Sequence, residues 1–69
     1  MDFTVERESA GSWHLVASAV EAETAAQAVA RACSDEGLYR AGPLGATGLR
    51  ELFVVPSWGP PEPVEPGLT

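Results

Sequence analysis

Two stretches of this chain carry apolar side chains at positions that would face both sides of a β-sheet. In residues 13–20, one face would carry Trp13, Leu15, Ala17 and Ala19, and the other would carry Val16 and Val20. The run 52–55 is apolar without alternation, which is typical of a strand buried on both sides. Because the chain shows only one helix pattern to cover these strands, one side of the sheet would need a partner from outside.

Four strands are predicted in all. Residues 2–8 alternate between apolar and polar, and the turn cluster 9–12, where Gly11 can adopt a positive φ, would join them to residues 13–20 as a hairpin. Further strands are expected over residues 38–41 and 50–55, the last ended by Pro56. The larger core side chains would come from these strands: Phe3, Val5, Leu15, Leu38, Phe53 and Val55.

One helix is predicted between the second and third strands. Thr24 and Gln27 have the spacing of a capping box, and Gly37 is a natural left-handed stop. The apolar stripe of this helix consists mostly of methyl groups, at Ala25, Ala28, Val29, Ala32 and Cys33. These elements predict an α+β fold, ββαββ, with one mainly antiparallel sheet, a single helix on one face and an open strand order.

Residues 1–58 are predicted to form a single α+β domain, and residues 59–69 a disordered, Pro-rich tail. The tail is poor in apolar residues and favours polyproline II; its prolines have P-x-x-P spacing but no flanking Lys or Arg, which favours an inert end over a ligand. A folded chain of 69 residues buries only about 60% of the surface that its unfolded form exposes. Its lone cysteine, Cys33, cannot form an internal disulfide, so packing or a partner has to supply the missing support.

The composition argues against several partners. Ten acidic residues against four arginines give a net charge of −6, so binding to nucleic acid or to an anionic membrane is not expected. The start of the chain does not resemble a signal peptide, and no apolar run is long enough for a membrane span, which favours a cytoplasmic location. The absence of Lys, Asn and Ile, with abundant Ala and Gly, is typical of a GC-rich bacterial genome or its phage.

Catalytic, metal-binding and cofactor-binding sites are not predicted. Cys33 falls on the apolar stripe of the helix, which favours a buried, inert thiol, and the only histidine, His14, lies in a strand beside Trp13. The carboxylate pairs at residues 6 and 8 and at residues 21 and 23 could face the same way, but no third oxygen ligand accompanies them. The chain is therefore not expected to be an enzyme.

The stretch from His14 through Ala22 and an Ala-rich helix to a strand that ends in Phe53-Val54-Val55-Pro56-Ser57 resembles the PaaB-type small subunit of bacterial phenylacetyl-CoA epoxygenase. This resemblance implies a non-catalytic subunit that supports the assembly of an enzyme. We therefore predict an accessory or interaction module that acts as a homodimer or as a subunit of a larger complex. Its partner-binding residues would be Trp13, Leu15, Val54 and Trp58.

The alternative is an acidic, phage-type inhibitor that blocks a nucleic-acid-binding surface. Such a charge mimic would lose its partner steeply as salt is raised, whereas a module that docks through a sheet face would not.

Overall fold

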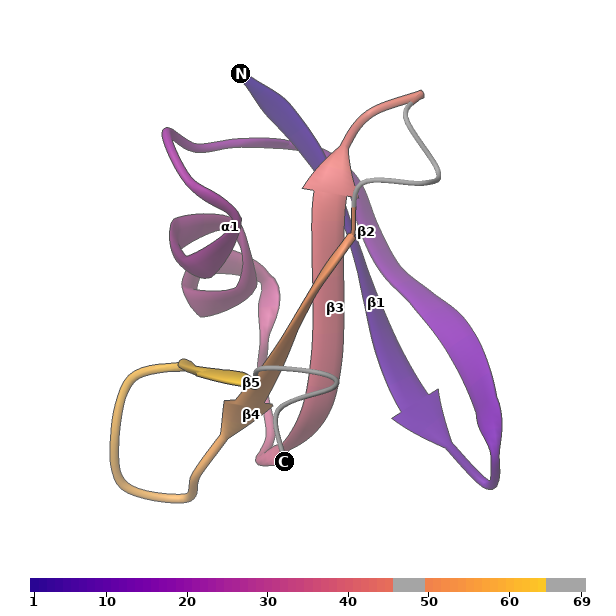
Figure 1. Cartoon of the computed structure of the whole chain (residues 1–69), viewed down its shortest axis with the longest axis vertical. Coiled ribbons are helices and arrows are strands. Elements are labelled where there is room, and N and C mark those ends of the chain that lie inside the picture. The colour runs from indigo at the N-terminus through magenta and orange to yellow at the C-terminus, as the bar shows by residue number, and fades with distance from the viewer. Residues whose placement is uncertain (46–49, 65–69) are drawn as a thin grey trace.

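The computed structural model describes residues 1–45 and 50–64, which form a five-stranded sheet with one helix packed on one side (Figure 1). The spatial order of the strands is β2-β1-β3-β4-β5, and all neighbours are antiparallel. This confirms the predicted α+β architecture and adds a short fifth strand. The elements are β1 (Asp2–Ser9), β2 (Ser12–Glu21), α1 (Ala25–Ala32), β3 (Gly37–Pro43), β4 (Glu51–Val55) and β5 (Glu62–Val64).

The predicted start of α1 is confirmed, but its predicted end is wrong. The Thr24 hydroxyl accepts a hydrogen bond from the backbone N–H of Gln27 at 3.2 Å, and the Gln27 side chain accepts one from the backbone N–H of Glu23 at 2.9 Å. The helix ends at Ala32, well before Gly37, which instead begins β3 with φ +149°.

The core lies between α1 and one side of the sheet. Its strand residues are Phe3, Val5, Tyr39, Ala41, Phe53 and Val55, and its helix residues are Ala25, Ala28 and Val29. The prediction that Leu15 and Leu38 belong to the core is wrong, because the cross-strand register turns both side chains to the other side of the sheet. Tyr39 takes the place expected for Leu38: it is 1% exposed, and its hydroxyl donates to the Asp35 carbonyl at 2.8 Å.

Irregular pairing in β2 breaks the alternation predicted for residues 13–20. Val5 pairs with Ala17, but the next residue of β1, Glu6, pairs with Leu15, and a second irregularity accompanies Ala19 at φ 58°. Each bulge shifts the following residues to the opposite face. Trp13 and Leu15 therefore point away from the helix, whereas Ala17 lies on the same side as α1.

The boundary predicted at residue 58 differs from the structure, because β5 lies inside the segment expected to be a disordered tail. Leu52 of β4 pairs with Val64, and Val54 pairs with Glu62. An edge strand tolerates proline because its outer N–H positions need no ladder partner, so Pro63 fits between these two pairs. The rest of the predicted tail, residues 65–69, lies outside the described residues.

Candidate interaction surface

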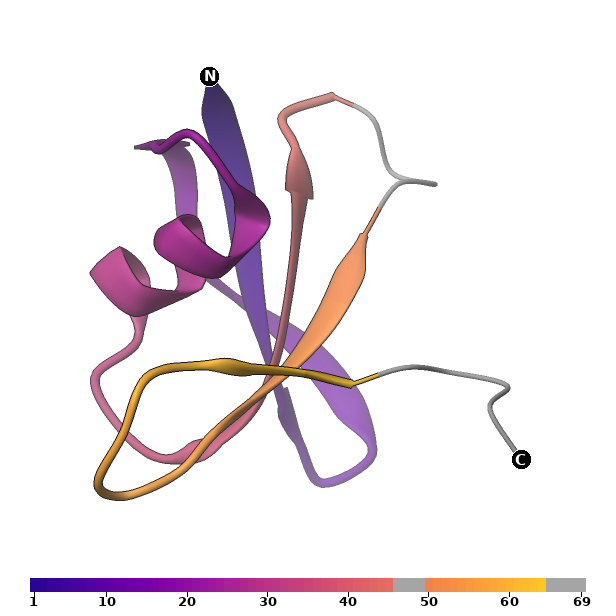
Figure 2. The same ribbon diagram turned by 60° about the vertical axis from the view of Figure 1, so that its left-hand side comes forward.

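The side of the sheet opposite α1 is formed by the outward-facing residues of the strands, and we call it the open face. One register row crosses it through Leu15, Glu6, Arg40, Leu52 and Val64. Figure 2 shows α1 on one side only of the sheet formed by β1 and β3. Within residues 1–45 and 50–64, no helix lies over the open face.

An ion cluster occupies the centre of the open face. The Oε1 atom of Glu6 accepts a hydrogen bond from Nε of Arg40 at 2.7 Å and lies 3.2 Å from Nε of Arg50. The Glu6 side chain is only 16% exposed, so water screens these contacts weakly. Two guanidinium groups share one carboxylate, and the cluster therefore carries one net positive charge.

The environment of Glu6 shifts its titration. The hydrogen bond from Arg40 lowers the pKa of this carboxyl below its usual 4.5, although partial burial acts in the opposite direction. The positive charges of Arg40 and Arg50 lower the pKa further. Glu6 is consequently ionised at neutral pH and holds both arginines over the sheet.

Trp13 supports this cluster from the edge strand. The guanidinium carbon of Arg40 lies 4.4 Å from the centre of the Trp13 ring, within the range of a cation–π contact. The same arginine thus binds Glu6 on β1 and covers Trp13 on β2. Trp13 is half-buried and acts as a platform for Arg40 rather than as a freely projecting anchor.

The other predicted partner-binding residues are exposed to different degrees. Leu15 in β2 is 63% exposed and Val54 in β4 is 43% exposed, so apolar side chains flank the ion cluster on both sides of the open face. Trp58 is 86% exposed, but it lies in the connection between β4 and β5, outside the strands. The structure therefore brings Trp13, Leu15 and Val54 onto one face and leaves Trp58 beyond the end of β4.

Sequence analysis missed Glu6, Arg40 and Arg50 as members of one cluster, because their separation along the chain hides the contact. Glu6 and Arg40 are directly opposite each other on β1 and β3, and the alternation of β4 brings Arg50 to the same side. The signal that could have found them is cross-strand charge pairing, which is visible only when the register is known.

The structure places the residues considered for other chemistry apart from one another. Cys33 is half-buried at the end of α1, and His14 is exposed on β2. Glu21 pairs with the N-terminal amine at 3.4 Å. Among the described residues, no group of His, Cys, Asp and Glu side chains could hold a metal ion, and no helix is long and apolar enough to cross a membrane.

No protein-family model matches this chain, and neither the curated proteins nor the solved structures include a significant match. The resemblance to the PaaB-type subunit therefore stays a prediction.

Proposed function

We propose that this protein is a small, non-catalytic interaction module that binds another protein through the open face of its sheet, and that a second copy of the chain is one such partner. The observation that supports this best is the exposure of Leu15 and Val54 on either side of a fixed ion cluster. Apolar side chains on a rigid sheet lose little conformational entropy on binding, which favours their use as contacts.

The charge distribution also supports docking at this face. The protein carries a net charge of −6, but the cluster of Glu6, Arg40 and Arg50 is locally positive by one charge. A second acidic chain meets the least repulsion where the local charge is neutral or positive. The positive charge is confined to the centre of the open face, because Glu8 lies opposite Trp13 and Glu62 lies opposite Val54 on the same face. Two copies would therefore meet with the least repulsion at Arg40 and Arg50.

The alternative of an acidic inhibitor would require carboxylates arranged along one surface like the phosphates of a nucleic acid. The strand registers instead place Asp2, Glu21 and Glu51 at one end of the sheet, and Glu36 and Glu62 towards the other end. This distribution supports sheet docking better than charge mimicry. A role as an accessory subunit in the cytoplasm of a bacterium, as the sequence suggests, fits the same proposal.

A pair of leucine substitutions tests the proposal. Leu15→Glu places a charge on the open face, whereas Leu44→Glu places the same charge at another exposed leucine, 52% exposed and just after β3. We expect Leu15→Glu to weaken self-association by about tenfold or more, because it would bury a carboxylate in the interface. Leu44→Glu should leave the dissociation constant unchanged.

Sedimentation velocity over a range of concentrations measures both variants. Equal association of the wild type and Leu15→Glu would exclude the open face as the interface. A steep loss of wild-type association between low and moderate salt would favour a charge-driven surface instead.

A further inference from the structure

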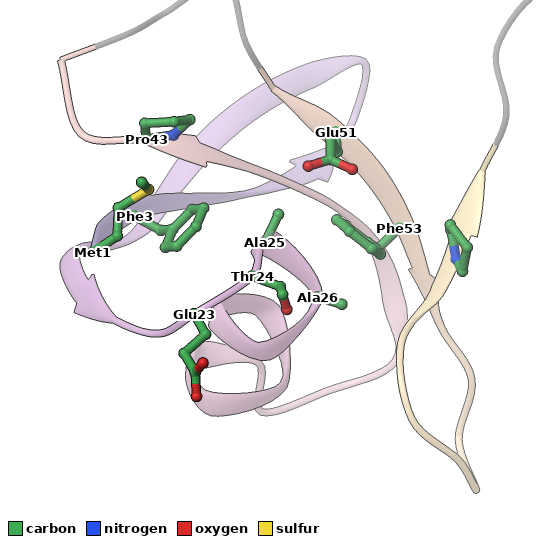
Figure 3. A pocket seen from close by; sticks show the side chains of 10 residues that line it. Met1, Phe3, Glu23, Thr24, Ala25, Ala26, Pro43, Glu51 and Phe53 are labelled. Carbon is green, nitrogen blue, oxygen red and sulfur yellow. The ribbon is translucent and has the colours of Figure 1, made fainter.

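The helix is too short to cover its own side of the sheet. α1 has eight residues and extends about 12 Å, whereas β1, also with eight residues, extends about 26 Å. At the first turn of α1, an open groove of about 670 Å³ remains between the helix and the strands β1, β3, β4 and β5 (Figure 3). This volume is within the range typical of ligand-binding cavities.

The interior of the groove is apolar. Figure 3 shows the rings of Phe3 and Phe53 on either side of Ala25, where they form its floor with the helix. Pro43 and Pro63 line the part formed by the strands. These groups offer no hydrogen-bonding side chain, so the matching group of a ligand is a large apolar side chain.

Glu23 and Glu51 stand at opposite sides of this apolar floor; Figure 3 shows the Glu51 carboxylate over the floor and the Glu23 carboxylate at the outer rim, pointing away from the two rings. Glu23 comes just before α1, where the helix dipole favours a negative charge, and its backbone N–H is held by the Gln27 side chain. Glu51 begins β4 and alternates with Phe53 and Val55, so it faces the same side of the sheet as the core. In the described part of the chain, neither carboxylate forms an ion pair.

We propose that this groove binds an extended segment of a partner protein that inserts one large apolar side chain and carries a Lys or Arg on either side of it. The basic residues would meet Glu23 and Glu51, which supply the charge complementarity. The groove is open to solvent rather than enclosed, so an extended chain laid across it fits better than a small ligand, which needs a more enclosed cavity. This site is on the side of the sheet opposite the open face and does not depend on the function proposed for that face.

Short synthetic peptides test the groove directly. The probe is an acetylated and amidated peptide of sequence GKFKG, added to the full ¹⁵N-labelled chain at low salt. We expect it to shift the amide signals of Ala25, Ala26 and Phe53. The peptides GEFEG and GKSKG should bind more weakly, because the first reverses the charges and the second lacks the apolar side chain.

Matched substitutions in the protein complete the test. Glu23→Gln and Glu51→Gln should each raise the dissociation constant of GKFKG by about two- to fivefold, the usual effect of losing one exposed ion pair. Glu36→Gln, which removes an exposed acid near the start of β3, should leave it unchanged. A similar loss in all three variants would overturn the proposal, since it would reflect net charge alone.

Three other results would also contradict the proposal. Equal binding of GEFEG and GKFKG would exclude recognition of the basic residues. If the amide signals of Ala25, Ala26 and Phe53 shift with protein concentration in the absence of peptide, a second copy of the chain occupies the groove. Groove signals that move on Leu68→Ala substitution would show that the C-terminal segment of the chain occupies it.

Discussion

Glu6 holds the open face together, because its carboxylate binds both Arg40 and Arg50. Its folded-state pKa is below 4.5, so its ionised form stabilises the fold at pH values above 4.5. This contribution decreases as the pH falls from 4.5 through the lower folded-state pKa, where the carboxyl becomes protonated.

We expect Glu6→Gln to lower the free energy of unfolding by about 1–2 kcal/mol at pH 7, since it removes charge-assisted hydrogen bonds that are only partly exposed. The difference from the wild type should shrink as the pH is lowered from 4.5 through the folded-state pKa, where the wild-type carboxyl is protonated. Urea unfolding followed by circular dichroism at several pH values measures this. A difference that stays constant over that range would contradict the role assigned to Glu6.

Gly37 is required for a different reason. Its φ of +149° is unfavourable for other residues, and a Cβ atom there would lie 2.9 Å from Nε of Arg7. Arg7 is fixed at this place because its Nη2 donates to the Glu36 carbonyl at 2.7 Å.

We expect Gly37→Ala to lower the free energy of unfolding by about 2–3 kcal/mol, through backbone strain and displacement of Arg7. Gly11→Ala is the control, because Gly11 also has a positive φ, of +80°, but no atom lies within 4 Å of its added Cβ. Gly11→Ala should lower the free energy of unfolding by only about 1 kcal/mol, because it adds backbone strain without a steric contact. If thermal or urea unfolding shows the same loss of stability in Gly37→Ala and Gly11→Ala, contact with Arg7 does not contribute.

At the scale of elements, local patterns predicted the start of α1 and the existence of the first four strands, whereas long-range contacts determined the rest. The helix stops at Ala32, and carbonyls in the following connection bind groups from the sheet: Asp35 accepts from the Tyr39 hydroxyl, and Glu36 accepts from Arg7. The bulges of β2 depend on its pairing with β1, and β5 depends on the free edge of β4. None of these contacts leaves a periodic signal in the sequence.

The candidate surface, too, could be predicted from the sequence only in part. Apolar runs predicted that Leu15 and Val54 would serve docking, and both lie exposed on the open face. The ion cluster between them could not be predicted, because Glu6 and Arg40 are 34 residues apart.

The two faces of β4 give a direct test of its orientation. Phe53 is 3% exposed, whereas the next residue, Val54, is 43% exposed on the open face. We expect Phe53→Ala to cost about 3–5 kcal/mol, which is comparable to the whole stability of a domain of this size, so the variant should be largely unfolded at 25 °C. Val54→Ala should cost less than about 1 kcal/mol. Circular dichroism and thermal unfolding distinguish the two, and a folded, stable Phe53→Ala protein would mean that the faces of β4 are assigned wrongly.

At the scale of the whole molecule, one short helix serves a five-stranded sheet and leaves two kinds of surface. The open face combines exposed Leu15 and Val54 with a positive ion cluster, and the groove beside α1 combines an apolar floor with two carboxylates. The two surfaces lie on opposite sides of the same sheet, so the contacts proposed for them do not overlap.

The central claim is that the open face is a docking surface, and the concentration dependence of the amide spectrum of the wild-type protein tests it most directly. On raising the concentration of the ¹⁵N-labelled chain from micromolar to millimolar, we expect signals of Trp13, Leu15, Arg40 and Val54 to shift together, while those of Ala25 and Ala26 in α1 stay in place. An unchanged spectrum, with diffusion typical of a 7.2 kDa monomer throughout, would contradict the claim.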